Sequence, residues 1–465
     1  MSRLKKLFSN TAIIAIGTFG SKLLVFLLMP LYTAWLSTGE YGAAEMVMSI
    51  SNFLIPIAAV GVSTGVFRFA AEKEADKQAV FSSSVALLGV GIGGFLLLSP
   101  LLLLVDYCRE YVWLVVLYVF FADIHAVFSQ YVRATDRTAL FAGQGILNTS
   151  SVIILNVLFL RFLELGVIGY VLSVVLGNLL TSLFLFFKAR LWTVFRFQKV
   201  KKQLMGELLR FSLPLIPTTL CWLITDLSDR YMVTYFCSPE ANGIYSAAYK
   251  IPTVVNLISG IFMQAWQFSA VAESSDAEGC KQFYSEVFRG FLSVIFIGAA
   301  GLILFSRFLT GLLLNTAYFE AWRYMPTLLC AAAIEALVSF LATVYMVRKK
   351  SMHSFFTAVI GTGANLLLNA FLIPTCGALG AAIATLAAYG VVLLARLIDT
   401  HRIIPFALSL PRLCANVVLL LCAAAVMTLD PTGRFWWTLA LTVLIVAINA
   451  PTLLGSMKRI LQRRK

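Results

Sequence analysis

"TAIIAIGTFGSKLLVFLLMPLYTAWL", residues 11–36, is the first long apolar stretch of the chain. It exceeds the roughly 20 residues that a helix needs to cross a bilayer, and similar stretches recur up to the C-terminus. Its one charged residue, Lys22, lies 11 residues from Thr11 and 14 from Leu36, which is roughly 16 Å and 21 Å along a helix. A lysine side chain is too short to reach either membrane surface from that depth. We therefore expect Lys22 to meet an anion inside the membrane.

The composition is that of a membrane protein along its whole length. Hydrophobic residues make up 60% and charged residues 12% of the 465 residues, against about 45–50% and about 25% in soluble domains. We predict an all-α polytopic membrane protein with no sizeable soluble domain. The N-terminal "MSRLKKLFSN" resembles a secretory signal, but the long run after it has no clear small-x-small cleavage site. We therefore interpret this run as a retained first membrane helix.

Fourteen apolar segments are long enough to span a membrane. These predicted spans are residues 11–36, 43–67, 82–105, 111–132, 139–160, 164–187, 208–236, 242–268, 284–306, 322–347, 353–374, 378–398, 408–429 and 434–454. The longest polar connection, residues 188–207, separates the first six spans from the last eight.

Lysine and arginine are distributed unevenly between the predicted loops. With the N-terminus inside, 28 of the 36 basic residues lie in cytoplasmic segments, 5 lie outside, and 3 (Lys22, Arg230 and Lys250) lie within spans. Cytoplasmic loops of membrane proteins collect Lys and Arg. The split predicts that both termini are cytoplasmic and that the number of spans is even. It also accounts for the net charge of +14 without a nucleic-acid partner.

The spacing of the cysteines indicates no metal site, and we expect no cofactor. The eight cysteines are scattered and lie mostly in apolar runs, with no CxxC or other metal-ligand spacing. We interpret them as small apolar packing residues.

The first six and the next six spans resemble each other weakly. Residues 31–73 and 232–274 match at eight positions when shifted by 201. Gly42 and Gly243 each open the second span of their half. Transporters are often built from such repeats, with the substrate site between them.

Two further matches join the fifth span to the sixth in each half. "LN" at 155–156 recurs at 368–369, and "GVIG" at 166–169 recurs as "GALG" at 377–380. We therefore predict two copies of one six-helix unit followed by two extra spans. The predicted parts are an N-terminal lobe (1–190), a basic cytoplasmic linker (191–207), a C-terminal lobe (208–403), and a last pair of spans with a basic tail (404–465).

Three stretches of the sequence carry a family likeness. They are "LFSNTAIIAIGTFGSKLLVFLLMPLYTAWLSTGEYGAAEMVMSI" (7–50), "LLRFSLPLIPTTLCWLITDLSDRYMVTYFCSPEANGIYSAAYKI" (208–251) and "NAFLIPTCGALGAAIAT" (369–385). In these stretches the chain resembles the polysaccharide-transporter branch of the multidrug/oligosaccharidyl-lipid/polysaccharide (MOP) exporter superfamily. That branch includes the O-antigen flippases, with the lipid II flippase as a cousin.

The resemblance implies a fold and a function. The implied fold has two six-helix lobes in a V around a central cavity that opens to one side at a time. The implied function is to move an undecaprenyl-diphosphate-linked oligosaccharide from the cytoplasmic to the outer leaflet of a bacterial or archaeal cytoplasmic membrane, for surface polysaccharide synthesis. Glycosyltransferases or a polymerase of the same pathway are the expected partners. By analogy with the lipid II flippase, the last two spans would flank a groove for the lipid tail.

Such a substrate sets requirements on the cavity. Sugar hydroxyls lose their water partners inside a bilayer, and a diphosphate needs at least one cation. Polar and charged residues inside spans are therefore candidates. The candidate substrate-binding residues are Lys22, Asn52, Asp226, Asp229, Arg230, Lys250, Asn256 and Gln264.

The resemblance supports only part of a cationic pocket. In related flippases, cations on spans 1, 2 and 8 are implicated in diphosphate binding. Lys22 and Lys250 fit this pattern. Span 2 departs from it, because its only basic residue is Arg68 at the cytoplasmic end.

The candidates also have structural interpretations. Asp226 lies four residues before Arg230, on the same helix face, and Asp229 lies directly before it, so we expect a local ion pair in this segment. Lys22 can meet a carboxylate such as Asp123 on another helix instead of a phosphate. Polar stripes on spans 2 and 8 can hold helices together rather than bind sugar.

Asp123, His125 and Glu335 are the other titratable groups inside predicted spans. Buried carboxylates and histidines can change charge as access changes, so these three are candidates for coupling to a proton or an ion.

Two other functions compete with the flippase hypothesis. The first is a cation-coupled drug or metabolite antiporter of the same superfamily, but such relatives usually stop at twelve spans and tend to place carboxylates in span 1. The second is a polymerase or ligase of lipid-linked glycans, which usually carries a large external loop. The longest external loop predicted here, near 307–321, has roughly 15 residues. No nucleophile–base pair stands out, so we predict a transporter rather than an enzyme.

Overall fold

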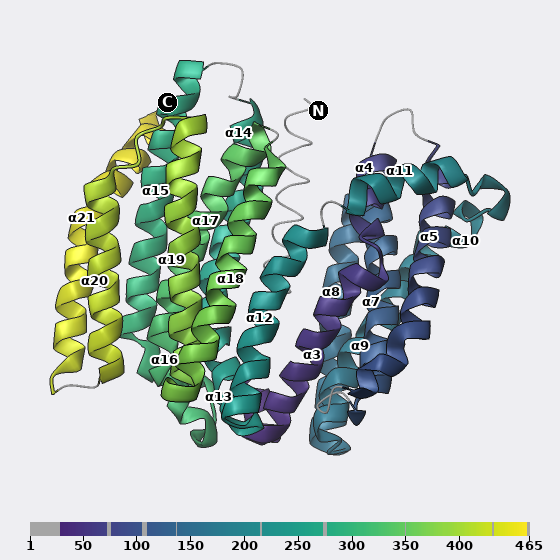
Figure 1. Ribbon diagram of the computed structural model, residues 1–465, viewed down its shortest axis with the longest axis horizontal. Helices are drawn as coiled ribbons and strands as arrows, with labels where there is room; N and C mark the ends of the chain where they lie inside the picture. The colour runs from purple at the N-terminus through teal and green to yellow at the C-terminus, as the bar shows by residue number, and fades with distance from the viewer. Residues whose placement is uncertain are drawn as a thin grey trace. The chain divides into compact units, whose positions relative to one another are not determined.

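The computed structural model describes residues 28–71, 76–104, 109–135, 137–213, 216–272, 277–348, 350–429 and 432–462. Within these ranges the regular structure is helical, with no β-strand (Figure 1). The chain divides into two compact units, Met1–Leu227 (unit 1) and Ser228–Lys465 (unit 2). The prediction of an all-α fold is confirmed. Lys22 and most of the first predicted span lie outside the described residues, and the four-part division stays a prediction.

Unit 1 is built around two neighbouring helices, α7 and α9. Helix α9 packs against both α7 and α8, and α7 also contacts α3 and α4. Apolar side chains of these helices and of α5 form one core cluster. The elements are α2 (Met29–Trp35), α3 (Thr38–Ala58), α4 (Val62–Ala70), α5 (Lys77–Leu98), η1 (Ser99–Leu104), α7 (Val112–Ala134), α8 (Thr138–Asn156), η2 (Val157–Phe162), α9 (Gly166–Lys188), α10 (Leu191–Val194), η3 (Phe197–Lys199) and α11 (Lys202–Ser212).

Unit 2 is built around α17, the most buried of the apolar helices. Helix α19 packs against α17 and α18, while α20 and α21 pack against each other and against α15. Helix α12 (Ile216–Phe236) crosses the boundary between the units. The other elements are α13 (Pro239–Lys250), α14 (Pro252–Ala272), α15 (Ala277–Leu304), α16 (Ser306–Leu313), η6 (Thr316–Arg323), α17 (Met325–Val347), α18 (Ser351–Cys376), α19 (Ala378–Ile403), α20 (Leu410–Leu429) and α21 (Arg434–Gln462).

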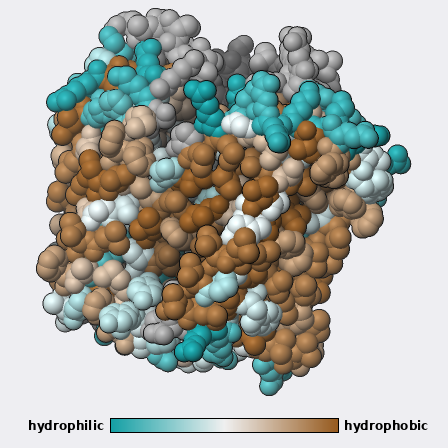
Figure 2. Space-filling view, turned by 45° about the vertical axis from the view of Figure 1, so that its right-hand side comes forward, coloured by the Kyte–Doolittle hydropathy of each residue, from teal (hydrophilic) through white to brown (hydrophobic). Residues whose placement is uncertain are grey.

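The helices have the length and composition of membrane spans. Eleven of them among the described residues are long and apolar enough to cross a bilayer, and α11 with α12, whose axes differ by 49°, would make a twelfth. Every predicted span from 43–67 onward coincides with helical structure. In Figure 2 apolar side chains cover the middle of the visible face, and hydrophilic ones gather along its upper edge. The chain is a multi-pass membrane protein.

Three predicted spans are not single continuous helices. Helix α3 ends at Ala58 and α4 begins at Val62, with Gly61 between them at φ 66°. Helix α13 ends at Lys250 and α14 begins at Pro252. The predicted span 208–236 is divided between α11 and α12, and its sequence carries two prolines near the division. Each of these interruptions lies near a proline in the sequence. Proline favours such breaks because it lacks an N–H donor and disfavours helical backbone in the residue before it.

Helix α5 approaches α3 closely at one glycine. A Cβ built on Gly91 would lie 2.3 Å from the carbonyl oxygen of Ala58 and 2.9 Å from Cγ2 of Val60. Gly93 and Gly94 on the same helix have no such neighbour within 4 Å. Small residues let membrane helices approach closely, and Gly91 has this role where α5 meets the end of α3.

We expect Gly91→Ala to destabilise the protein by about 1–3 kcal/mol, because the new methyl group forces the α3 backbone to move. The measurement is the midpoint of thermal unfolding of the detergent-solubilised chain, with unfolding monitored by size-exclusion chromatography. Gly94→Ala makes the same change on the same helix in open space and should unfold at the wild-type temperature. Equal midpoints for the two variants would contradict the close α3–α5 approach.

Candidate functional site

The carboxylate of Asp229 on α12 is the centre of a buried polar cluster in unit 2. Its side chain is 2% exposed. One carboxylate oxygen accepts hydrogen bonds from the amides of Asn365 at 3.1 Å and Asn369 at 2.7 Å. The other accepts from the hydroxyls of Tyr245 at 3.0 Å and Thr385 at 2.5 Å. These five residues, from α12, α13, α18 and α19, are called the Asp229 cluster below.

The cluster has the chemistry of an ion or proton site. Four neutral donors can hold a negative charge where water is scarce. Carboxylate, amide and hydroxyl oxygens are also the ligands that small hard cations prefer. The side-chain oxygen of Asn369 is buried and accepts no hydrogen bond from the described residues. No group of three or more His, Cys, Asp or Glu residues suited to a metal occurs in the described part of the chain.

The remaining candidates of unit 2 and of the boundary helix α12 have different surroundings. Asn256 on α14 donates from its amide to Glu335 Oε2 on α17 at 2.9 Å, so one predicted substrate residue contacts one predicted coupling residue. Asp226, Arg230 and Lys250 are half-buried. The side chain of Gln264 lies outside the part of the chain that the structure describes.

The local ion pair suggested for Asp229 is not seen among the described residues. The hydrogen bonds of Asp229 go to α13, α18 and α19, although Arg230 follows it directly in the chain. Neighbouring residues on a helix point in different directions, and here Asp229 points into unit 2.

The candidates of unit 1 lie at separate places. Asn52 Oδ1 on α3 accepts from the hydroxyl of Tyr118 on α7 at 3.2 Å. Asp123 on α7 is 1% exposed, and neither carboxylate oxygen has a hydrogen-bond partner among the described residues. His125 Nε2 lies 2.6 Å from Gln144 Oε1 on α8. Two positions apart on one helix, Asp123 and His125 face different directions and do not form a pair.

Sequence reasoning missed four members of the Asp229 cluster. Tyr245, Asn365, Asn369 and Thr385 were not among the candidates. One signal was available: Asn365 and Asn369 are four residues apart in a mostly apolar span, so both amides lie on one helix face.

An apolar groove of about 480 Å³ lies between α19 and α20. Residues of α15 and α17 also contribute to it, and all the side chains that line it are apolar. Leu394 on α19 and Val418 on α20 are exposed at its edge. Its other lining residues on α19 and α20 include Ile383, Leu386, Gly390, Leu413, Val417 and Leu421.

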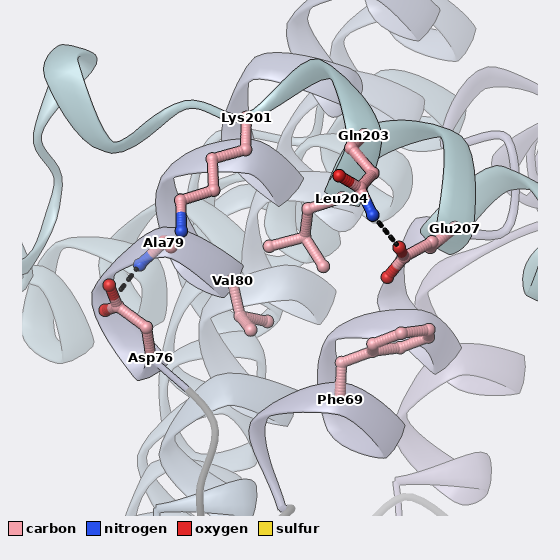
Figure 3. A pocket seen from close by; sticks show the side chains of 8 residues that line it. All are labelled: Phe69, Asp76, Ala79, Val80, Lys201, Gln203, Leu204 and Glu207. Atoms are coloured by element: carbon pink, nitrogen blue, oxygen red, sulfur yellow. Dashed lines mark hydrogen bonds between the residues drawn. The ribbon is translucent and has the colours of Figure 1, made fainter.

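A second pocket, of about 330 Å³, lies in unit 1 between α4, α5 and α11 (Figure 3). Three of its polar side chains, Asp76, Gln203 and Glu207, already have hydrogen-bond partners. Asp76 accepts from the backbone N–H of Ala79 at 3.1 Å, and Gln203 donates to Glu207 at 3.0 Å. A hydrogen bond from Lys199 holds the pKa of Asp76 below its usual range. Because these groups already have partners, the pocket is a weaker candidate for substrate binding than the groove.

A sequence model of the family described as "Polysaccharide biosynthesis protein" matches residues 7–267, more than half of the chain. The chain belongs to this family. A search of curated proteins found no match to the sequence.

Solved structures with the same fold have low sequence identity to the chain. "Lipid II flippase MurJ, inward closed conformation" is 16% identical with a TM-score of 0.72, covering 97% of this chain and 100% of that chain. An inward-facing multidrug resistance MATE family transporter of the MOP superfamily is 16% identical with a TM-score of 0.69, covering 82% and 95%. A MOP superfamily transporter from Pyrococcus furiosus Vc1 is 15% identical with a TM-score of 0.62, covering 85% and 96%. The MOP-superfamily resemblance predicted from the sequence is confirmed.

We expect Asp229→Asn to destabilise unit 2, because the new amide would place N–H donors against groups that already donate. A buried polar group left without a partner costs about 1–3 kcal/mol. The measurement is the thermal unfolding midpoint in detergent. Asp226→Asn makes the same chemical change one turn earlier on α12, at a half-buried position, and should have a smaller effect. Equal small effects would contradict the hydrogen-bond network around Asp229.

Proposed function

We propose that the chain moves an undecaprenyl-diphosphate-linked oligosaccharide from the cytoplasmic to the outer leaflet by alternating access. Membership of a polysaccharide biosynthesis family supports this substrate class. The observation that carries the proposal is the helix pair α20–α21 with its apolar groove. The match to the lipid II flippase covers 97% of the chain, so it must include most of α20 and α21, whereas the drug-transporter match covers 82%.

The groove between α19 and α20 suits the polyprenyl tail. A tail that leaves the bilayer for an apolar groove gains little from the hydrophobic effect, because lipid is already apolar. What the groove offers is shape and dispersion contacts with closely packed side chains. In the proposed function it orients the tail while the headgroup crosses the membrane.

The headgroup needs polar partners along the crossing path. We propose that the cations Lys22, Arg230 and Lys250 meet the diphosphate, since charge-assisted hydrogen bonds to phosphate are the strongest available. Asn52, Asp226, Asn256 and Gln264 are the proposed partners for sugar hydroxyls. Both termini are proposed to be cytoplasmic, from the distribution of Lys and Arg.

Coupling to an ion is proposed at the Asp229 cluster, with Asp123, His125 and Glu335 as further candidates. The cluster also favours a second candidate function, cation-coupled export of a drug or metabolite. Both functions would use a buried carboxylate with hydroxyl and amide neighbours. They differ in the transported molecule, so the accumulation of a lipid-linked saccharide distinguishes them.

Depletion of the chain in its host should cause a lipid-linked saccharide to accumulate on the cytoplasmic face and surface polysaccharide to fall. Lys22→Arg should restore surface polysaccharide and Lys22→Ala should not, because only a cation can pair with the diphosphate. The measurement is surface glycan together with lipid-linked intermediates, at matched protein levels. Normal surface glycan without accumulation would contradict the flippase function. Full complementation by Lys22→Ala would contradict only the phosphate role.

Filling the groove should impair transport without unfolding the protein. Gly390 on α19 lines the groove and has no neighbour within 4 Å of a built Cβ, so Gly390→Leu places a side chain where the tail would lie. Gly363→Leu on α18 makes the same change in open space away from the groove. We expect at least a several-fold lower flipping rate in proteoliposomes for the first variant only. Equal rates in both would exclude the groove from the transport path.

A further inference from the structure

The connection that leaves α9 runs along the surface of unit 1 rather than as a free tether. Residues 188–206 are called the collar below. The chain turns out of α9 at Arg190, which has a positive φ of 52°. The carbonyl of Ala189 accepts from the guanidinium of Arg137 at 3.0 Å, and Leu191 is fully buried in the core of unit 1.

Two serines of α5 hold the middle of the collar. The hydroxyl oxygen of Ser82 accepts from the backbone N–H of Arg196 at 2.9 Å, and that of Ser83 accepts from the N–H of Lys201 at 3.1 Å. Lys199 forms an ion pair with Asp76 at 2.8 Å. Three attachments in six residues give the collar a defined outer face.

That outer face is aromatic. The ring of Trp192 lies 5.6 Å and 5.7 Å from the rings of Phe186 and Phe187 at the end of α9. Phe187, Trp192 and Phe195 are exposed, and Phe197 is 82% exposed. Because α9 has the length and composition of a membrane span and ends at Lys188, we expect these rings at the level where the bilayer meets water. Tryptophan and other aromatic residues concentrate at that level in membrane proteins.

The same segment is strongly basic. Residues 188–206 hold six lysines and arginines and no acidic residue. Lys199 is paired with Asp76, and Lys201 points toward the first turn of α5 (Figure 3). Lys188, Arg190, Arg196 and Lys202 are exposed. Exposed aromatic rings between exposed cations match an anionic lipid surface, whose headgroups attract the cations and whose upper acyl region accepts the rings.

We propose that the collar is a binding surface for anionic phospholipids of the adjacent leaflet, which the charge distribution predicts to be cytoplasmic. A basic loop that is only solvated would not explain Phe197, because exposing a large apolar ring to water is unfavourable. In the proposed arrangement the rings enter the interface and the exposed cations contact lipid phosphates, chiefly Lys188, Arg190, Arg196 and Lys202. Each exposed cation should contribute about fivefold to the binding constant.

The test compares the full chain in two nanodiscs, one of phosphatidylcholine alone and one with a third of phosphatidylglycerol. We expect the anionic lipid to slow hydrogen exchange of residues 191–206 by at least about fivefold, and added salt to reverse this. Lys188→Gln/Arg196→Gln/Lys202→Gln should abolish the difference. Phe197→Ser should reduce the difference between the two nanodiscs. Because Phe197 is 82% exposed, this substitution should act through lipid contact and not through the packing of unit 1.

A matched triple variant controls for net charge. Arg348→Gln/Lys350→Gln/Arg402→Gln removes three exposed cations from unit 2 and should leave the effect of phosphatidylglycerol on residues 191–206 intact. Unchanged exchange of α5 and α9 shows that the collar variants are folded. Equal exchange in the two nanodiscs for the wild-type chain would overturn the proposal. Equal loss of the effect in both triple variants would also overturn it, since general charge would then be the cause.

Discussion

Hydrogen-bonding groups inside a bilayer must find their partners in the protein, because lipid tails offer none. Helices meet this constraint along their length, but their interruptions need local substitutes. At the interruption between α13 and α14, the hydroxyl of Thr253 donates to the carbonyl of Lys250. Between α3 and α4, the N–H of Gly61 donates to the carbonyl of Pro56 at 3.1 Å. These bonds supply partners where the regular helical pattern stops, so spans can be interrupted near their prolines.

The same constraint applies to the buried carboxylates, and each unit meets it in a similar way. Glu45 in unit 1 and Asp229 in unit 2 are both buried, and each accepts a hydrogen bond from a tyrosine hydroxyl. Asn156 and Asn369, the residues of the repeated "LN", both donate through Nδ2 to a neighbour and bury Oδ1 without a partner among the described residues. The two six-helix halves therefore resemble each other in their buried hydrogen-bonding groups as well as in the order of their spans.

Apolar length and the distribution of charge predicted the helices, because both properties are local in the chain. The places where spans are interrupted depend instead on prolines, and a proline can begin, bend or end a helix according to its surroundings. Asp229 could be singled out as a carboxylate in a span. Its partners are 16 to 156 residues away on three other helices, and only tertiary packing selects them. Lys22, which the apolar pattern made prominent, lies outside the described residues.

The fold by itself does not select a substrate, so selection must come from surfaces added to it. A lipid-linked saccharide has an apolar tail, an anionic diphosphate and a polar glycan, and each needs a different surface. In this chain the apolar groove, lined by residues of α15, α17, α19 and α20, is the surface that we propose for the tail. In the proposed function a tail gains almost no hydrophobic free energy on leaving lipid, so the groove would orient the tail rather than bind it tightly, and the tail could be released after each transport cycle.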